Sequence, residues 1–549
     1  MTKLFSLISM IAVSIAGCVS TPLEGLLPGQ RTNEVTLELG KSLEREICKG
    51  ETHIYEVVAP SNHVIRGVVE QRGVDVVVRI KDPHGAMIAT IDSPNGTNGP
   101  EPWSFEAEAA GTWHIEVSPL PETDQPGHYE ARIEEIITSY ENAERAAKRH
   151  YQSARMLKLW KEFRSEGPLA IERFAKEMEG HAPLVEPLEG DPQGDVLITF
   201  VRRVPSKKYA QVVGGPARPA VRLLRFQETD IMYLTLRCPR DARFGYGFIV
   251  RGESEFEAGT SSFEADPWNP HDFAMSSLLE LPAAPAQDWA QKIPSVSAGR
   301  LVEGTIHSEI LGEERKVCIY LPAAFEPTHG PHPYVVVLDG EAYGHWAKPL
   351  IPTPIILDNL IAQGKIAPML AVLVDSGKTR DVDLAMSARF SDFLAKELAP
   401  WVRREYGAAV DPAKVTLSGS SLGGLCAAYS AFRHPDVFGN VLSQSGSFWF
   451  SPGALENTRG FGFDTGALIS EIVASPPRAL HFWMEVGIFE GGDQLTENRR
   501  MRDVLLAKGY GVDYHEFSGG HDYACWRGTL ADGLRALAGG GASIARESH

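Results

Sequence analysis

The central stretch of the sequence is Val415-Thr-Leu-Ser-Gly-Ser-Ser-Leu-Gly-Gly-Leu425, in which a β-prone run meets a small-residue turn and then a helix-compatible run. Residues Gly419 to Gly423 fit the pattern G-x-S-x-G, which holds a serine in a strained turn between a strand and a helix. Ser421 is therefore the candidate nucleophile. Because the bare pattern also arises by chance in glycine-rich loops, a base, an acid and an oxyanion hole must come from the rest of the chain.

Strand-like and helix-like segments alternate around this turn, from residue 295 to the end of the sequence. The β-prone runs lie at 316–321, 334–338, 369–374, 415–417, 440–443, 481–486 and 512–517, with helical stretches such as 390–404 and 496–508 among them. This alternation predicts a mostly parallel, doubly wound sheet with helices on both faces. The active site is then expected at the carboxyl ends of the strands.

Two loops that follow late strands offer the partners of a serine nucleophile. The run ending at Val486 leads into a glycine-rich loop with Glu490 and Asp493, and the run ending at Phe517 leads into a loop with His521. The resulting order of serine, acid and histidine is that of an α/β-hydrolase. We expect His521 to be the general base and Glu490 to orient its ring, with Asp493 as the alternative acid.

The anionic intermediate of acyl transfer needs an oxyanion hole, usually made of two backbone N–H groups. Leu422 follows the nucleophile directly and is expected to supply the first donor. The second is expected from Gly340 or Glu341, which follow the strand-like run 334–338.

The N-terminus combines a basic start, an apolar run over residues 4–16 and the sequence Ile15-Ala-Gly-Cys18. This pattern resembles a bacterial lipoprotein signal, and its apolar run is too short for a spanning helix. The resemblance implies cleavage before Cys18, lipidation of its thiol and, with Val19 next, an outer-membrane anchor, so that the protein is periplasmic or on the cell surface. The alternative is a secretory signal with an incidental cysteine.

Overall composition restricts the partners further. The formal net charge of −18 argues against nucleic acid, which requires a basic face. The cysteines are scattered without a C-x-x-C pair, so no metal site, cofactor or disulfide framework is indicated. One disulfide between Cys426 and Cys525 is left open, as is the oligomeric state.

The segments before the α/β region read as two β-rich domains. A tether at 19–33 follows the signal at 1–18, and short β runs punctuated by turns then predict a β-sandwich over 34–136. Phrases such as Asp82-Pro-His-Gly85 and Gly111-Thr-Trp-His114 resemble the bacterial pre-peptidase C-terminal domain, an accessory module. We expect a helical connector over 137–182, a second β-sandwich over 183–290 and a catalytic α/β-hydrolase domain over 291–549.

Several phrases of the C-terminal half look like enterochelin esterase, a member of the esterase D group. They are Leu338-Asp-Gly-Glu341, Gly419-Ser-Ser-Leu-Gly-Gly424, Val441-Leu-Ser-Gln-Ser-Gly-Ser-Phe-Trp449, Glu485-Val-Gly-Ile-Phe-Glu490 and Gly519-Gly-His-Asp-Tyr-Ala-Cys-Trp-Arg-Gly528. The second sandwich, with Ala265-Asp-Pro-Trp-Asn-Pro270, resembles the amino-terminal domain of that enzyme. The resemblance implies that the substrate is a catecholate siderophore and that hydrolysis of its serine-trilactone esters releases iron.

The same resemblance implies residues that contact the substrate. Trp449 and Trp526 are candidates to stack on catechol rings, although core aromatics are the alternative. A ferric triscatecholate is anionic, so its binding needs a basic cluster, for which the candidates are Arg380, Arg499, Arg500 and Arg527. The family segment R-x-x-E-L-P-C-N departs here to Arg380-Asp-Val-Asp-Leu384 followed by Ala-Met-Ser, which leaves the substrate open.

Two other interpretations remain. One is a different esterase D activity that removes feruloyl or acetyl groups from glycans. The other is a surface binding protein whose hydrolase domain holds a ligand without turnover.

Overall fold

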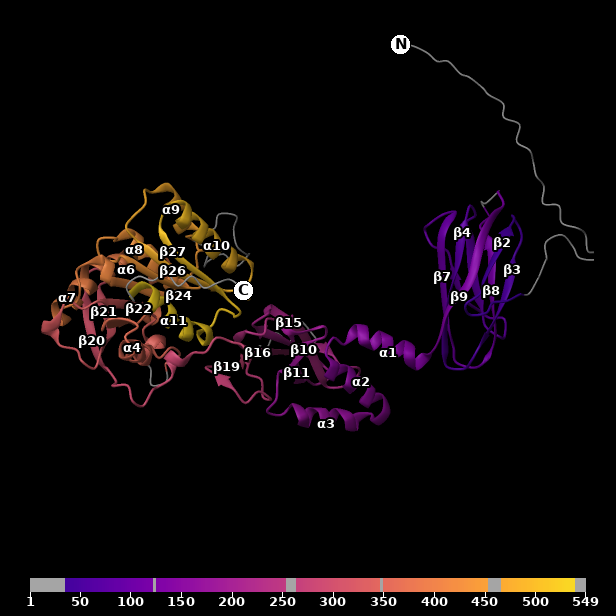
Figure 1. The fold of residues 1–549 in the computed structure, drawn as a ribbon, viewed down its shortest axis with the longest axis horizontal. Coiled ribbons are helices and arrows are strands. Elements are labelled where there is room, and N and C mark those ends of the chain that lie inside the picture. Colours follow the sequence, from indigo (N-terminus) through magenta and orange to yellow (C-terminus); the bar gives the residue numbers. More distant parts are fainter. Residues whose placement is uncertain (1–34, 122–124, 253–262, 346–348, 453–465, 539–549) are drawn as a thin grey trace, which may run out of the picture. The chain divides into compact units, whose positions relative to one another are not determined.

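The computed structural model describes residues 35–121, 125–252, 263–345, 349–452 and 466–538 (Figure 1). Cys18 and the predicted tether lie outside these ranges. The contacts of the chain divide it into two compact units, Met1–Tyr151 and Gln152–His549. Within the described ranges, none of the helices has the length and apolar character that crossing a membrane requires.

The first unit contains two β-sheets with the strand orders β1-β3-β8-β5-β6 and β2-β9-β4-β7. The strands are β1 (Val35–Thr36), β2 (Ser42–Ile47), β3 (His53–Ala59), β4 (His63–Arg72), β5 (Val76–Lys81), β6 (Met87–Ile91), β7 (Asn98–Ala107), β8 (Gly111–Pro119) and β9 (Gly127–Thr138). From Glu101 onwards, β7 alternates buried and exposed residues, so that only one face of the strand meets the core. Val57 of β3 and Trp103 of β7 belong to the apolar core that both sheets share.

Three helices occupy most of the range predicted as a connector, namely α1 (Ser139–His150), α2 (Ala154–Glu166) and α3 (Pro168–Met178). Thr138 and Glu141 form a capping box that fixes the start of α1. Gly167, with a φ of 62°, separates α2 from α3. The left-handed backbone at this position explains the glycine and the sharp turn between the two helices.

The second unit begins with a further pair of β-sheets, here called the second sandwich. Their orders are β10-β11-β15-β14 and β13-β12-β16-β19-β18, with β17 paired to β16. The strands are β10 (Leu184–Leu188), β11 (Asp191–Arg203), β12 (Lys208–Gly214), β13 (Ala217–Arg222), β14 (Leu224–Arg225), β15 (Ile231–Cys238), β16 (Arg243–Gly252), β17 (Phe263–Glu264), β18 (Asp272–Phe273) and β19 (Ser276–Glu280). Phe200 of β11 and Phe248 of β16 are buried in one core between these sheets.

The C-terminal part contains an eight-stranded sheet with the order β20-β21-β23-β22-β24-β25-β26-β27. Its strands are β20 (Arg300–Ser308), β21 (Glu313–Leu321), β22 (Tyr334–Leu338), β23 (Leu370–Val374), β24 (Val415–Ser420), β25 (Asn440–Gln444), β26 (His481–Gly487) and β27 (Gly511–Phe517). The pairs β20·β21 and β21·β23 are antiparallel, and the other pairs are parallel. The predicted mostly parallel sheet therefore matches the structure, apart from the initial antiparallel strands.

Helices cover both faces of this sheet. They are α4 (Thr353–Ala362), α5 (Arg380–Asp383), α6 (Ala388–Phe393), α7 (Ala399–Tyr406), α8 (Leu422–Arg433), α9 (Ala467–Ala474), α10 (Gly492–Ala507) and α11 (Tyr523–Ala538), with short 3-10 or π turns η1 (Asp288–Ala290), η2 (Pro327–His329), η3 (Glu341–His345), η4 (Gly377–Thr379), η5 (Leu394–Leu398) and η6 (Pro412–Lys414). Side chains of β22 enter two cores alternately: Val336 packs with α8 and α10, whereas Val335 and Val337 pack with α4 and α11. Figure 1 shows these helix pairs on opposite sides of the sheet.

The helix predicted over 390–404 is divided in the structure. Helix α6 passes through the π turn η5 into α7, which has Pro400 in its first turn. Proline lacks the N–H that would continue the regular hydrogen-bond ladder, so a change of helical pitch before it is expected.

Candidate active site

Ser421 lies in a sharp turn between β24 and α8. Its backbone has a φ of 58° and a ψ of −124°, a conformation that costs free energy for a residue with a Cβ atom. Gly419 makes room for the turn, because a Cβ atom at this position would lie 2.6 Å from the carbonyl carbon of Gly423. Gly419 is therefore required by close backbone contact, whereas a Cβ atom at Gly423 would make contacts of ordinary length, 3.5 Å or more. Ser421 is half-buried, directly after the carboxyl end of β24.

Glu490 and His521 meet across two loops at the same end of the sheet. His521 Nδ1 lies 2.5 Å from Glu490 Oε2, and the side chain of Glu490 has no exposed surface. The other carboxylate oxygen, Oε1, accepts hydrogen bonds from the backbone N–H of Gly487 at 2.7 Å and from Ser445 Oγ at 2.5 Å. Asp493, the alternative acid, is exposed in the first turn of α10.

Sequence reasoning missed the support of this carboxylate by Ser445 and Trp526. The indole Nε1 of Trp526 donates to Ser445 Oγ at 3.0 Å, and that hydroxyl in turn donates to Glu490. Trp526 is only 3% exposed and packs edge-on against His521. The predicted stacking of a substrate ring on Trp526 is therefore wrong, since almost no ring surface is open to a ligand.

The hydroxyl of Ser421 faces Ser447 in this structure. The two Oγ atoms are 3.3 Å apart, and the backbone N–H of Ser447 donates to the carbonyl oxygen of Ser421 at 3.0 Å. Among the hydrogen bonds of the described residues, none joins Ser421 to His521. Such bonds are often long in the absence of substrate and tighten when the substrate binds.

The oxyanion donors follow the prediction only in part. Leu422 is the first residue of α8, where a backbone N–H has no partner within the helix. Glu341 likewise begins the π turn η3. The N–H of Gly340 instead donates to the carbonyl oxygen of Val374 at 2.9 Å, so Gly340 is excluded as an oxyanion donor.

Arg380 is held by a buried carboxylate. Its Nε and Nη2 atoms each lie 2.7 Å from one oxygen of Asp339, and Ser376 Oγ donates to the same carboxylate at 2.5 Å. Asp339 is 3% exposed and has a φ of 57°, directly after β22. Arg380 thus fixes the loop that carries Glu341.

The other predicted substrate arginines are also engaged by protein groups. Arg499 forms two hydrogen bonds of 2.7 Å with Glu516 on the outside of the domain. Arg500 contacts Glu497 at 3.3 Å. The prediction of a free basic cluster is therefore not supported at these two positions, because both lie on α10 with acidic partners.

Arg527, on α11, donates from Nε to the side-chain oxygen of Gln287 and lies over the ring of Phe273 at 5.0 Å. Burial lowers the pKa of its guanidinium. Trp449 is half-buried, and its indole N–H donates to Gln494 at 2.7 Å. Trp449 keeps some exposed surface near the nucleophile loop, so its stacking role stays a prediction.

A buried polar network lies behind the nucleophile. Glu485 of β26 is 1% exposed and accepts hydrogen bonds from Gln444 Nε2 at 3.0 Å and Thr529 Oγ1 at 2.5 Å. Burial raises the pKa of the Glu485 carboxyl to about 8. Gln444 also accepts from the Tyr343 hydroxyl at 2.8 Å, and its backbone oxygen accepts from the N–H of Ser421 at 2.9 Å. The sequence predicts no role for Glu485, because nothing in the local pattern distinguishes this buried acid from other residues of the strand.

The described cysteines are all free thiols, including the buried Cys426 and Cys525. The disulfide left open between these two is therefore absent. Over the described ranges, no group of three or more His, Cys, Asp or Glu side chains is arranged to hold a metal ion.

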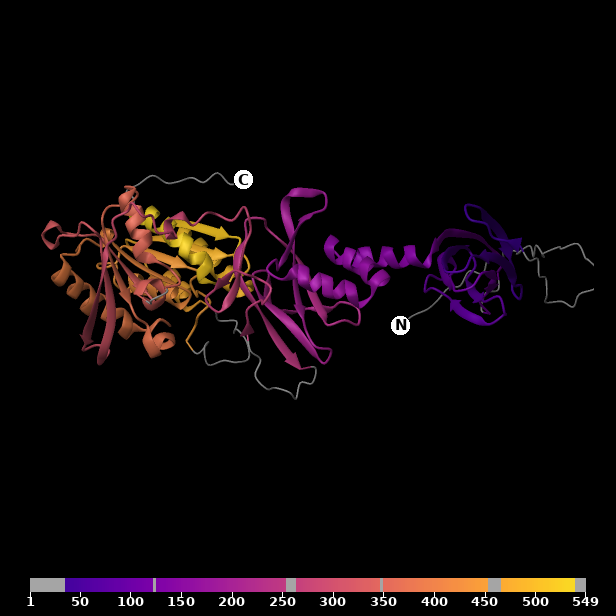
Figure 2. The same cartoon turned by 90° about the horizontal axis from the view of Figure 1, so that it is seen from below.

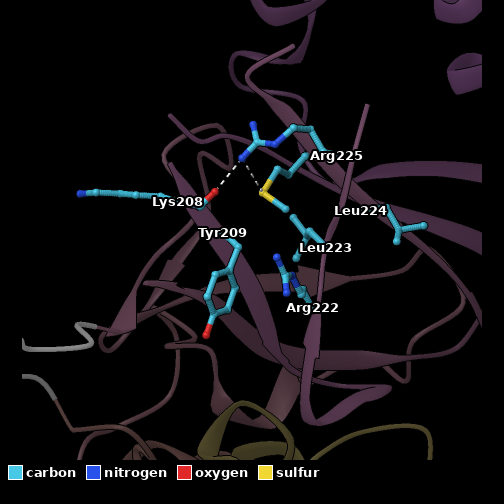
Figure 3. Close-up of a pocket in the computed structure, with 7 residues that line it drawn as sticks. Lys208, Tyr209, Arg222, Leu223, Leu224 and Arg225 are labelled. Carbon is cyan, nitrogen blue, oxygen red and sulfur yellow. Dashed lines mark hydrogen bonds between the residues drawn. The ribbon is translucent and has the colours of Figure 1, made fainter. Parts of the chain in front are cut away.

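A separate pocket of about 320 Å³ lies in the second sandwich, at the edges of β13 and β14 (Figure 3). Its lining residues are Lys208, Tyr209, Arg222, Leu223, Leu224, Arg225 and Met232. Arg225 donates to the carbonyl oxygens of Val204, Thr229 and Lys208 and so closes this corner of the sandwich. None of the residues predicted for the active site lines the pocket.

Comparison with known proteins agrees with this architecture. Residues 308–537 match the family model described as "Putative esterase". The strand order and the serine turn fit the α/β-hydrolase fold, and the chain is a carboxylic ester hydrolase.

Individual relatives narrow the class. An iron(III) enterobactin esterase of Dickeya dadantii is 31% identical over 387 residues, which cover 63% of this chain and 86% of the relative. An iron(III) salmochelin esterase of Escherichia coli O6:H1 is 29% identical over a region that covers 67% of this chain and 93% of the relative. The crystal structure of the Shigella flexneri enterobactin esterase in the presence of enterobactin has a TM-score of 0.53 and 26% identity, and covers 67% of this chain and 97% of that one. The chain belongs to the iron(III) enterobactin esterase family.

Proposed function

We propose that the protein is a serine esterase that hydrolyses the ester bonds of a catecholate siderophore of the enterobactin type. The observation that carries the proposal is the pair formed by His521 and the buried Glu490, together with the strained turn of Ser421. Such an arrangement gives a serine hydroxyl a base and gives that base an anionic partner. The names of the relatives supply the substrate class.

The proposed reaction begins with proton transfer from Ser421 Oγ to His521 Nε2, because Nδ1 is engaged by Glu490. The hydroxyl oxygen attacks the ester carbonyl, and the N–H groups of Leu422 and Glu341 stabilise the negative oxygen that forms. His521 then returns the proton to the leaving alcohol, which leaves an acyl group on Ser421. A water molecule, deprotonated by the same imidazole, releases the acid.

The carboxylate of Glu490 suits this cycle because it accepts three hydrogen bonds, from Gly487, Ser445 and His521. Three donors stabilise the ionised form of a carboxylate and keep it in one orientation. An ionised Glu490 would stabilise the imidazolium that appears twice in the cycle. Hydrolysis of the siderophore ring in this way weakens the binding of the iron ion that the siderophore carries.

Arg380, Arg499 and Arg500 each have an acidic partner within the protein. A cluster of positive charges is therefore a less suitable means of recognising an anionic substrate. The proposal therefore places the aromatic contribution on Trp449 and assigns no charge recognition to Arg380, whose guanidinium is paired with Asp339.

The test compares Ser421→Ala with the wild type on ferric enterobactin. We expect loss of turnover by at least about three orders of magnitude with binding retained, because only the nucleophile is removed. The matched control is Ser470→Ala on the exposed side of α9, which should keep full turnover. Turnover in Ser421→Ala would reject the mechanism, and a preference for feruloyl or acetyl esters over triscatecholates in the same assay would reject the substrate class.

We propose further that lipidation of Cys18 anchors the protein at the outer membrane and that the N-terminal sandwich is an accessory module of the pre-peptidase C-terminal type. Both proposals rest on sequence patterns. Cys18→Ser is expected to move the protein from the membrane fraction to the soluble fraction. Continued membrane association of that variant would reject the anchor.

A further inference from the structure

The loop that carries His521 is docked on strand β16 of the second sandwich. The N–H of Arg243 donates to the carbonyl oxygen of Ser518 at 2.9 Å, and Arg243 forms a parallel bridge with Gly519. The N–H of Gly245 donates to the side chain of Asp522 at 3.2 Å. These contacts join residues that are more than 270 positions apart in the sequence.

The thiol of Cys525, on helix α11, also forms a hydrogen bond to β16. Cys525 Sγ donates to the carbonyl oxygen of Arg243 at 3.1 Å, and its backbone N–H donates to Asp522 Oδ1 at 3.2 Å. The space around the loop is full, since a Cβ atom at Gly519 would lie 2.5 Å from Cys525 Sγ and 2.8 Å from the Arg243 carbonyl oxygen. The loop therefore has little freedom to shift without breaking these bonds.

Strand β16 also contacts Phe489, the residue before Glu490. The ring of Phe244 packs edge-on against Phe489 with 5.8 Å between centroids, and the N–H of Phe489 donates to the carbonyl oxygen of Gly519 at 3.0 Å. One strand thus contacts the residue before Glu490 and both sides of His521. The second sandwich and the C-terminal sheet adjoin in both views of the chain (Figures 1 and 2).

We propose that β16 of the second sandwich positions the base of the active site, with Asp522 and Cys525 as the positioning residues that clamp the His521 loop. The sandwich is then a structural part of the catalytic centre. The proposal rests on the proposed function, in which His521 acts as the base. A displacement of a reacting group by about 1 Å can lower turnover on the order of 100-fold, so a loosened clamp should be visible in kinetics.

The test uses the full chain and a small p-nitrophenyl ester, whose hydrolysis requires the base but little substrate recognition. Asp522→Asn replaces one of the two carboxylate oxygens that accept the N–H groups of Gly245 and Cys525. We expect kcat to fall about 10- to 100-fold, with KM within about twofold of the wild-type value. Cys525→Ala should lower kcat less, and Cys525→Ser should restore most of it, because a hydroxyl can donate to the Arg243 carbonyl oxygen.

The matched control is Asp358→Asn. Asp358 also accepts a backbone N–H from a distant segment, that of Gly299 at 2.8 Å, but contacts no residue of the proposed triad. We expect its kcat to be unchanged. If Asp522→Asn and Cys525→Ala keep the wild-type kcat, or if Cys525→Ser is no better than Cys525→Ala, the clamp is rejected.

His521→Ala separates this outcome from failure of the proposed function. Loss of turnover in that variant combined with full turnover in Asp522→Asn rejects only the clamp. Turnover retained in His521→Ala rejects the proposed function itself. Should Asp522→Asn fail to fold, the Cys525 pair decides the question alone.

Discussion

Replacing Glu485 by glutamine should change how the stability of the protein depends on pH. The Glu485 carboxyl is buried, and its pKa is raised from 4.5 to about 8, chiefly by burial. The folded protein therefore keeps this proton up to about pH 8, whereas the unfolded chain releases it near pH 4.5. The contribution of the neutral acid is full below pH 4.5 and is lost as pH rises towards 8.

The magnitude follows from the two pKa values. They differ by about 3.5, and each unit corresponds to about 1.4 kcal/mol, so the wild type loses about 5 kcal/mol from this group between pH 4.5 and pH 9. Glu485→Gln, which is always neutral, should not lose it. With an unfolding entropy of about 2.1 cal/mol/K per residue over a unit of about 400 residues, the variant gains about 6 °C in Tm relative to the wild type across that range.

Scanning calorimetry of both proteins at several pH values between 5 and 9 measures this difference. The control is Glu516→Gln: the Arg499 guanidinium lowers the pKa of Glu516, so its contribution is present above about pH 4.5 and is lost only in more acidic solution. The Tm difference of this control should be constant from pH 5 to 9. A Glu485→Gln difference that is equally constant would refute the assignment of a neutral buried acid.

Two further variants test the support of the site. Arg380→Ala should lower stability by about 3–5 kcal/mol, measured as a drop in Tm, because it leaves the buried Asp339 carboxylate without its cation; a change below 1 kcal/mol would contradict a tight pair. Trp526→Phe keeps an aromatic ring but removes the N–H that Ser445 accepts, so kcat on a p-nitrophenyl ester should fall about tenfold at constant KM. An unchanged kcat in that variant would show that Ser445 orients the acid without the indole.

The parts of the site that sequence predicted are those with a local signal. Ser421 has a glycine pattern that indicates its own backbone conformation. Glu490 follows the apolar strand β26, and His521 follows the β-prone run 512–517. Parallel strands bring their carboxyl ends to one edge of a sheet, so chain order alone places these loops near each other. The structure accordingly brings Glu490 to His521.

The parts that sequence could not predict depend on partners from distant elements. Gly340 belongs to the expected loop, but its N–H is used by Val374 on the neighbouring strand, which no local pattern reveals. The arginines were assigned by charge, and their neutralisation by groups such as Asp339 and Glu516 appears only after folding. The sequence shows which side chains exist, whereas tertiary packing decides which of them are already bonded to other protein groups.

The docking of the His521 loop on β16 also bears on how such proteins diverge. Asp522 and the facing segment of β16, from Arg243 to Gly245, contact each other across two domains. A substitution in one of them alters the fit of the other, so we expect the two to change together among related proteins. Recombination that joined the second sandwich of one relative to the C-terminal sheet of another would separate a matched pair. A chimaera with its junction near residue 290 takes these two segments from different parents. It is therefore expected to recover activity only when residues 243–245 are also exchanged for those of the parent that supplies the His521 loop.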